Sequence, residues 1–370
     1  MYLLPKPKTI KGQDGQMLLC HSTHIVMTKE VAETEMHAAK RLQEAIRQET
    51  GLILPFSVGE VREGDLSLGI AKTLPEQTYE ITIDEKGGQI SGGDGAGVLY
   101  GVETFCQIVQ QCGGILPCVQ IQDAPDMPNR GYYFDQTRGR VLKLEELKKI
   151  ADRMCRYKLN QLQLYVEHTY LFRDFSEMWR DQTPLTAEEI LELDSYCRER
   201  HIELVPSLAS FGHLCTLLST KTYGDLCEME DSWKEPFSFW NRMRYHTINV
   251  SDERSLPLIK KMIAEYMQLF SSNKFNICAD ETFCLGKYKS KKLAEERGVH
   301  RLYIDYVKEL AQFLVENGKI PMFWGDIIWN SPELMKELPE SMICLNWGYA
   351  PEQREDETRA IAQTGAVQYL

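Results

Sequence analysis

The chain has 370 residues, of which 43% are hydrophobic and 26% are charged, and its formal net charge at pH 7 is -12. This length can bury one large core or two modest ones. The acidic balance and the lack of a basic run argue against a nucleic-acid partner, and no apolar run is long enough to cross a membrane. Because the first residues, MYLLPKPKTIKG, lack the segments of a secretory signal, we predict a cytoplasmic protein.

Residues 1–128 show the pattern of a small α+β domain. An amphipathic helix is predicted to end at Gly51, and a second helix to begin near Ala96. Strands are predicted at 66–70, 79–84, 89–92 and 119–123. The segment 123–131, DAPDMPNRG, holds two prolines and is the predicted linker to the rest of the chain.

A glycine-rich turn, SGGDGAG at 91–97, follows a predicted strand and opens a predicted helix. This arrangement is also typical of dinucleotide-binding sites, but Val98 stands where the third glycine of that motif belongs. We therefore interpret these glycines as residues that supply positive φ angles at the start of the helix.

From residue 129 onward, extended apolar runs alternate with helical runs, a pattern typical of parallel α/β folds. A capping box at Thr186 and Glu189 marks the start of one such helix. The predicted strands are 131–137, 161–167, 202–208, 275–280, 320–326, 342–347 and 366–370. Seven strands over this length fit a (β/α)8 TIM barrel better than a doubly wound sheet. We predict an α/β barrel over 129–370, with its eighth strand expected from a longer chain.

The carboxyl ends of barrel strands carry the catalytic groups of such folds. Polar and aromatic residues end these predicted strands: Asp135, Arg138, Glu167, His168, His213, Asp280, Glu281, Trp324, Asp326, Trp347 and Tyr349. Arginine can bind neighbouring sugar hydroxyls, tryptophan offers a flat face to a sugar ring, and carboxylates supply acid chemistry. Each also has a structural alternative, since the aspartate can pair with an arginine, and the histidines and tryptophans can belong to the core.

Two adjacent carboxylates, Asp280 and Glu281, follow the apolar run FNICA. Carboxylates brought to the end of a buried strand carry a desolvation cost and therefore often have a function, although an Asp capping the next helix would also fit. Side chains at adjacent strand positions diverge, so we expect this acid pair to meet different parts of one substrate.

The segment 214–249 is weakly patterned and rich in aromatic residues: Trp233, Phe237, Phe239, Trp240 and Tyr245. It follows a predicted barrel strand. Two interpretations remain open, a wall of the active site and a small satellite core beneath the loop.

Taken together, these motifs resemble glycoside hydrolase family 20, the β-N-acetylhexosaminidases, over nearly the whole chain. YEITID, QISGGDGAGVLYGVETFCQ and IQDAP resemble the family's N-terminal domain. FDQTR places Arg138 at an arginine that binds the terminal sugar, LVPSLASFGH places His213 at a third-strand histidine, and ICADE supplies the acid pair. Trp324 and Trp347 match aromatic residues of the acetamide pocket.

The chain also departs from the family pattern. Asn276 to Ala279 replace the glycines and histidine usually found before the acid pair, and LYVEHTY, which contains Glu167 and His168, replaces the common second-strand pattern. The family's last strand, which brings a tryptophan and an acid into the pocket, is not recognised in this sequence.

The resemblance implies an exo-acting hydrolase that removes a terminal β-linked N-acetylhexosamine with retention. The acetamido oxygen of the substrate is the nucleophile in this family. By this assignment Glu281 is the general acid and later the base, and must carry a proton when the bond breaks, whereas an ionised Asp280 holds the acetamido N–H.

Two alternatives remain open. One is a retaining glycosidase in which Glu281 pairs with Asp326 or Glu167 as nucleophile at about 5 to 5.5 Å, and the other is a non-catalytic sugar-binding homologue. The 11 cysteines are odd in number and lie mostly in apolar segments, so neither a disulfide framework nor a structural zinc site is predicted. The predicted partner is a carbohydrate, with no metal and no cofactor.

Overall fold

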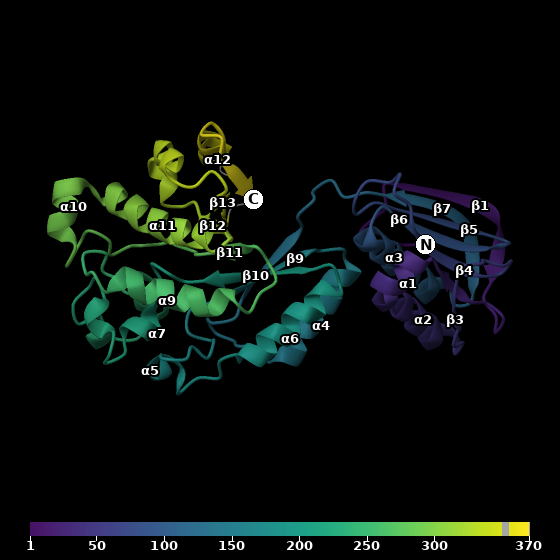
Figure 1. The fold of residues 1–370 in the computed structure, drawn as a ribbon, viewed down its shortest axis with the longest axis horizontal. Helices are drawn as coiled ribbons and strands as arrows, with labels where there is room; N and C mark the ends of the chain where they lie inside the picture. The colour runs from purple at the N-terminus through teal and green to yellow at the C-terminus, as the bar shows by residue number, and fades with distance from the viewer. Residues whose placement is uncertain (350–354, 370) are drawn as a thin grey trace. The chain divides into compact units, whose positions relative to one another are not determined.

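The computed structural model describes residues 1–349 and 355–369 (Figure 1). Contacts divide the chain into two compact units. The first unit comprises Met1–Tyr132, Glu145–Gln161 and Ser195–Glu203, and the second comprises Tyr133–Leu144, Leu162–Asp194 and Leu204–Leu370. None of the helices in the described ranges is both long and apolar enough to span a membrane.

The first unit is built on a mixed sheet with the strand order β1-β7-β5-β6-β4-β2-β3. The α2 helix packs against α3, and α3 lies against the sheet (Figure 1). The elements of residues 1–123 are β1 (Thr9–Leu18), β2 (Ile25–Met27), α1 (Lys29–Thr34), α2 (Met36–Thr50), β3 (Phe56–Val58), β4 (Leu66–Ile70), β5 (Tyr79–Asp84), β6 (Gly87–Gly92), α3 (Gly95–Cys112) and β7 (Ile115–Asp123).

The predicted elements of this region are present, and α2 ends at Gly51 in the left-handed conformation, as expected of a helix-terminating glycine. Three strands were not predicted. The β1 strand is almost wholly exposed and so lacks apolar alternation, while β2 and β3 have three residues each. Such strands give too weak a periodic signal to be recognised from sequence.

The glycine-rich turn is explained by close packing, and the predicted positive φ angles are wrong. None of Gly92, Gly93, Gly95 and Gly97 has a φ angle in the left-handed region. A Cβ atom on Gly93 would collide with the carbonyl oxygen of Pro75, and one on Gly97 with that of Thr78. The Asp94 carboxylate accepts the Gly97 N–H and so occupies the helix N-terminus, where a phosphate would bind.

From residue 131 onward, strands and helices alternate. The strands and main helices are β8 (Gly131–Asp135), α4 (Leu144–Arg156), β9 (Gln161–Val166), α6 (Ala187–Arg198), β10 (Glu203–Leu208), α9 (Ser255–Met267), β11 (Lys274–Asn276), α10 (Lys291–Arg297), α11 (Val299–Glu316), β12 (Ile320–Trp324), β13 (Ile343–Leu345), α12 (Glu355–Ala362) and β14 (Val367–Tyr369). Short helices are α5 (Ser176–Trp179), α7 (Cys215–Leu218), η1 (Gly224–Leu226), η2 (Ser232–Lys234), α8 (Phe239–Arg244), η3 (Ile328–Asn330) and η4 (Pro332–Glu337). The predicted capping box is present, since Thr186 and Glu189 each accept the other's backbone N–H.

The strands β8 to β14 form one seven-stranded sheet in sequential order. The pairs of adjacent strands from β10 to β14 are parallel, and their inward side chains build a core of Val205, Met322, Ile343 and Leu345. The α11 helix packs against α9 and lies beside β12 (Figure 1). This order is that of a (β/α)8 barrel holding seven strands in the described ranges, so the predicted fold is confirmed.

The predicted barrel strands end within two residues of the observed ones, except the fourth, which is much shorter than expected. The interval 275–280 was predicted as strand, but β11 ends at Asn276. Cys278 and Ala279 then adopt left-handed φ angles of 58° and 62°, which no extended strand contains. The predicted strand 366–370 is present as β14, with Leu370 outside the described residues.

Candidate active site

A cavity of about 250 Å³ opens where the strands of the second unit end. Its lining comes from the strands β8, β9 and β12, from the segments that follow β8, β11 and β13, and from α8. The residues that line it are Tyr133, Asp135, Arg138, Tyr165, Met243, Asp280, Glu281, Trp324, Trp347, Gly348 and Tyr349. Seven of the eleven predicted site residues are in this set, and it falls at the strand ends where a barrel carries its functional groups.

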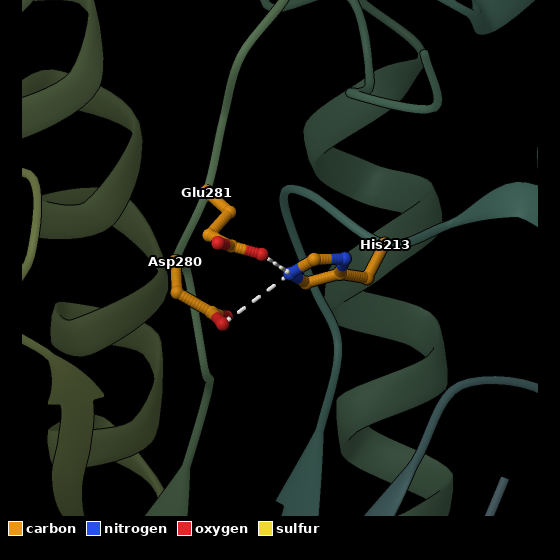
Figure 2. Close-up of side chains that lie close together, drawn as sticks. All are labelled: His213, Asp280 and Glu281. Carbon is orange, nitrogen blue, oxygen red and sulfur yellow. Dashed lines mark ion pairs between the residues drawn. The ribbon is translucent and has the colours of Figure 1, made fainter. Parts of the chain in front are cut away.

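The acid pair meets one histidine at the edge of this cavity. The imidazole Nε2 atom of His213 lies 3.3 Å from a carboxylate oxygen of Asp280 and 3.3 Å from one of Glu281 (Figure 2). The ring is 2% exposed. Since both carboxylates converge on one nitrogen, the prediction that the two side chains diverge is wrong.

The backbone explains this convergence. Glu281 and His213 both have left-handed φ angles, of 49° and 59° respectively. The chain between β11 and the acid pair is therefore a series of tight bends, to which strand alternation does not apply. Gly212 allows the two segments to approach, because a Cβ atom there would lie 2.6 Å from the carbonyl oxygen of Asp280. Left-handed non-glycine residues are uncommon and cluster at functional sites.

Burial and charge act in opposite directions on His213. Burial alone would lower the pKa of the imidazole, but the charge of Asp280 and the contacts with both carboxylates outweigh it and raise the pKa to about 10. The ring is therefore a cation at neutral pH. Its ligand atoms and those of the acid pair lie within 4.8 Å of one another, close enough to share a metal ion. With the imidazole 3.3 Å from both carboxylates, the three groups form an ion-paired cluster.

Asp326 lies behind the acid pair and is not among the described residues that line the cavity. Its Oδ2 atom accepts the backbone N–H of Glu281 at 3.0 Å. Burial, followed by the charge of Asp280, raises the pKa of Asp326 to about 7. This residue was predicted to bind substrate, but the structure places it against the backbone of the predicted acid.

Arg138 lies on the opposite wall of the cavity. Its Nε donates to Asp135 Oδ2 at 2.6 Å, its Nη1 reaches the Met243 sulfur at 3.3 Å, and its guanidinium lies 4.7 Å from the centre of the Tyr165 ring. Asp135 also accepts the backbone N–H of Arg138. The Nη2 atom makes no hydrogen bond to any residue in the described ranges, so it remains available to a ligand.

Glu167 and His168 lie outside the cavity lining formed by the described residues. Glu167 is 3% exposed, and its two oxygens accept from the Tyr165 hydroxyl and from Arg242 Nη2, both at 2.9 Å. His168 is buried beside the Thr216 hydroxyl, and burial lowers its pKa. Both were predicted to bind substrate, but their polar atoms already face protein partners, because the second-strand segment turns Glu167 toward α8 and His168 toward α7.

Aromatic rings form the remaining wall. Trp324 packs edge-on against Tyr133, with ring centres 5.0 Å apart, and Trp347 packs against Tyr349 at 5.4 Å. Tyr349 is 97% exposed. Sequence reasoning missed Tyr133, Tyr165 and Met243. The two tyrosines alternate inward along β8 and β9, and that period-2 signal could have revealed them.

The aromatic segment 214–249 contributes to the cavity through Met243 alone among its described residues. Its large aromatics Trp233, Phe237, Phe239 and Trp240 are exposed. Neither of the two interpretations holds for these four side chains, which are not buried in a satellite core and are not among the described residues that line the cavity.

Sequential parallel strands that surround a cavity with an adjacent acid pair and several aromatic rings define a glycosidase-like barrel. The family model described as glycosyl hydrolase family 20, domain 2, matches residues 1–124. The model described as glycosyl hydrolase family 20, catalytic domain, matches residues 128–370. The chain belongs to glycosyl hydrolase family 20, and the predicted resemblance is confirmed.

Several curated relatives are β-hexosaminidases. The β-hexosaminidase of Porphyromonas gingivalis is 24% identical over 363 residues, which cover 88% of this chain and 45% of that protein. Lacto-N-biosidase of Bifidobacterium bifidum is 20% identical over 350 residues, which cover 89% of this chain and 30% of that protein. The chain thus spans about half the length or less of these relatives.

Solved structures show the same fold. The chitobiase of Flavobacterium johnsoniae matches with a TM-score of 0.83 at 19% identity, over 99% of this chain and 58% of that one. The β-N-acetylhexosaminidase of Streptomyces coelicolor matches with a TM-score of 0.81 at 19% identity, over 100% of this chain and 74% of that one.

Proposed function

We propose that this chain carries the catalytic site of an exo-acting β-N-acetylhexosaminidase that works by substrate-assisted retention. The observation that carries the proposal is the convergence of Asp280 and Glu281 on one buried imidazole at the edge of the cavity. A cavity of about 250 Å³ is at the small end for ligand sites, which suits a single terminal sugar. The names of the curated relatives support this substrate class.

In the proposed reaction, the acetamido oxygen of the substrate attacks the anomeric carbon while Glu281 donates its proton to the leaving glycosidic oxygen. The product of this step is a cyclic oxazolinium-type intermediate. Glu281, now a carboxylate, takes a proton from the water that opens the ring, so the overall configuration is retained. Each proton that Glu281 gives is thereby regained within one turnover.

Asp280 is suited to hold the acetamido group. Its Oδ1 atom has no hydrogen-bond partner in the described ranges, although it is buried. A buried carboxylate oxygen without a partner is costly, and a substrate N–H would satisfy it. The ring of His213 contacts the other oxygen, Oδ2, at 3.3 Å and so leaves Oδ1 for the substrate.

The alternative with an enzymatic nucleophile is less well supported by the geometry. Both oxygens of Glu167 are bonded to protein groups, and Asp326 faces the Glu281 backbone. Neither of these two carboxylates is therefore presented to an anomeric carbon in the cavity. The acetamido oxygen supplied by the substrate needs no such group.

The proposal is tested by comparing aryl β-glycosides that carry either an N-acetyl group or a hydroxyl at carbon 2. We expect turnover of the N-acetyl compounds and at least about a thousandfold lower kcat/KM for the hydroxyl analogues, since the latter lack the nucleophile. Comparable turnover of both would indicate an enzymatic nucleophile. Saturable binding of N-acetylglucosamine without turnover of either would indicate a sugar-binding homologue.

A further inference from the structure

The segment that carries Glu281 is a strained bend, held in place by hydrogen bonds to β12, Ser210 and Tyr303. After β11 ends, Cys278, Ala279 and Glu281 all have left-handed φ angles, each unfavourable for a residue with a side chain. The Tyr303 hydroxyl donates to the carbonyl oxygen of Ala279 at 3.0 Å and so anchors the bend two residues before Glu281. At Glu281 itself, the backbone N–H donates to Asp326 Oδ2 at 3.0 Å.

Asp326 is well placed to hold this bend. It follows β12 directly, and β12 pairs in register with β11, so the two ends are fixed relative to each other by sheet hydrogen bonds. The Trp324 N–H also donates to the Cys278 carbonyl oxygen at 2.9 Å, which continues the pairing beyond the end of β11. A carboxyl group on such a rigid element is a defined anchor for a left-handed residue beside it.

We propose that Asp326 is a positioning residue for the reaction, whose carboxyl oxygen holds the Glu281 backbone in the left-handed bend that aims the general acid into the cavity. This inference rests on the proposed function, since it gives Glu281 the role of the acid. It makes the hydrogen-bond acceptor at Asp326 the essential feature. A neutral acceptor of the same shape should therefore work nearly as well as the carboxyl group.

Asparagine is a close replacement for this purpose. Because burial raises the pKa of Asp326 to about 7, the native side chain is largely neutral in mildly acidic solution, as an amide is. Asp326→Asn keeps an oxygen that can accept the Glu281 N–H. Asp326→Leu keeps the same branched arrangement of side-chain heavy atoms but has no acceptor, so it removes the bond without leaving a cavity.

The experiment measures kcat and KM of the full chain and these two variants at pH 5.5, with N-acetylglucosaminides that bear good or poor leaving groups. For Asp326→Leu we expect kcat on the poor leaving group to fall by about 10- to 100-fold, because displacing a catalytic group by about 1 Å can cost that much. The loss on the activated aryl substrate should be below about threefold, because that bond needs little protonation. Asp326→Asn should stay within about threefold of the native protein on both substrates.

A matched control is Asp194→Leu. Asp194 is also a buried aspartate that accepts a backbone N–H at 3.0 Å, from Ser271, but it is not among the described residues that line the cavity. Its replacement should lower the melting temperature without changing the ratio of the two kcat values. If Asp326→Leu does not fold, the expected near-native kinetics of Asp326→Asn at pH 5.5 still test the claim that a neutral acceptor suffices.

Three results would overturn the inference while leaving the proposed function intact: equal losses in both Asp326 variants, a loss in Asp326→Leu that is independent of the leaving group, or no loss in Asp326→Leu. A native chain that turns over neither N-acetylglucosaminide would instead contradict the proposed function. Binding of a monosaccharide inhibitor is measured for each variant as well. A variant that still binds the inhibitor has a folded cavity, so its loss of kcat is not caused by misfolding.

Discussion

The two walls of the cavity differ in how completely their charges are paired. On the wall formed after β8 and β9, Arg138 is bonded to Asp135, and both oxygens of Glu167 are bonded to protein donors. On the wall formed after β11 and β12, one oxygen of Asp280 is buried without a hydrogen-bond partner, and so is one oxygen of Asp326 behind it.

This difference indicates that the two walls have different roles. A wall whose charges are already paired is rigid and can present donors to a substrate with little reorganisation. A wall with unpaired buried polar atoms has an unfavourable free energy that a ligand can relieve, which is typical of groups that take part in chemistry. We therefore assign binding mainly to the Arg138 wall and proton transfer to the Glu281 wall.

The largest expected effect is on the proton-transfer wall. Glu281→Gln should lower kcat by about 10²- to 10⁴-fold on substrates with poor leaving groups, since a general acid typically contributes that much. On activated aryl N-acetylglucosaminides the loss should be much smaller. Steady-state kinetics with a series of leaving groups measures both.

A suitable control for this substitution is Glu295→Gln, on the exposed side of α10, where the carboxylate pairs only weakly with Lys291 at 4.0 Å. It should leave all kinetic constants unchanged. An equal loss of kcat on every leaving group in Glu281→Gln would contradict its assignment as the acid of the first step.

A second prediction tests whether the ion pair between Arg242 and Glu167 stabilises the folded protein. Arg242→Ala should reduce the free energy of unfolding by on the order of 3 kcal/mol, because it leaves the buried charge of Glu167 with only the Tyr165 hydroxyl as donor. Urea denaturation followed by circular dichroism measures this change.

Arg244→Ala, on the same helix, is the matched comparison. Its guanidinium lies over the exposed ring of Trp240, at 5.2 Å, so its loss should change the free energy of unfolding by less than about 1 kcal/mol. If the two variants are equally stable, the Glu167 pair does not hold the binding wall.

A smaller effect is expected from the charge of Asp326. Its pKa is about 7 in the folded protein against a reference value of 3.8, so the folded state binds the proton more tightly and loses stability as the pH rises from about 4 to 7. Asp326→Asn lacks this loss. Its melting temperature relative to the native protein should therefore rise by roughly 2–4 °C between pH 5 and pH 7.5. A constant or falling difference would contradict the raised pKa.

The barrel strands and the acid pair could be predicted from sequence because buried parallel strands give strong apolar runs with polar residues at their ends. The seven predicted strands lie where β8 to β14 are found. Edge strand β1 was missed because seven of its ten residues are exposed in one run. The local pattern of apolar residues therefore predicts whether a strand is buried better than it predicts whether a segment belongs to a sheet.

The arrangement of the site could be predicted only in part. Residue types and strand ends identified Arg138, the acid pair and the tryptophans as cavity residues, but they could not show that Glu167 faces Arg242, 75 positions along the chain. The convergence on His213 depends on left-handed bends at non-glycine residues, for which the sequence gives no local signal. Gly212 is the exception, because a glycine beside a candidate histidine is compatible with close backbone approach.

The division between the two walls is tested most directly by calorimetric titration of a monosaccharide N-acetylhexosamine inhibitor into Arg138→Ala and Glu281→Gln. We expect Arg138→Ala to weaken binding by about ten- to a hundredfold, since a lost charged donor to buried hydroxyls costs about 1.5 to 3 kcal/mol. Glu281→Gln should change the dissociation constant by less than about threefold, and the exposed control Arg140→Ala should not change it. Unchanged affinity in Arg138→Ala, or a loss in Glu281→Gln as large as that in Arg138→Ala, would contradict the assignment of binding and proton transfer to separate walls.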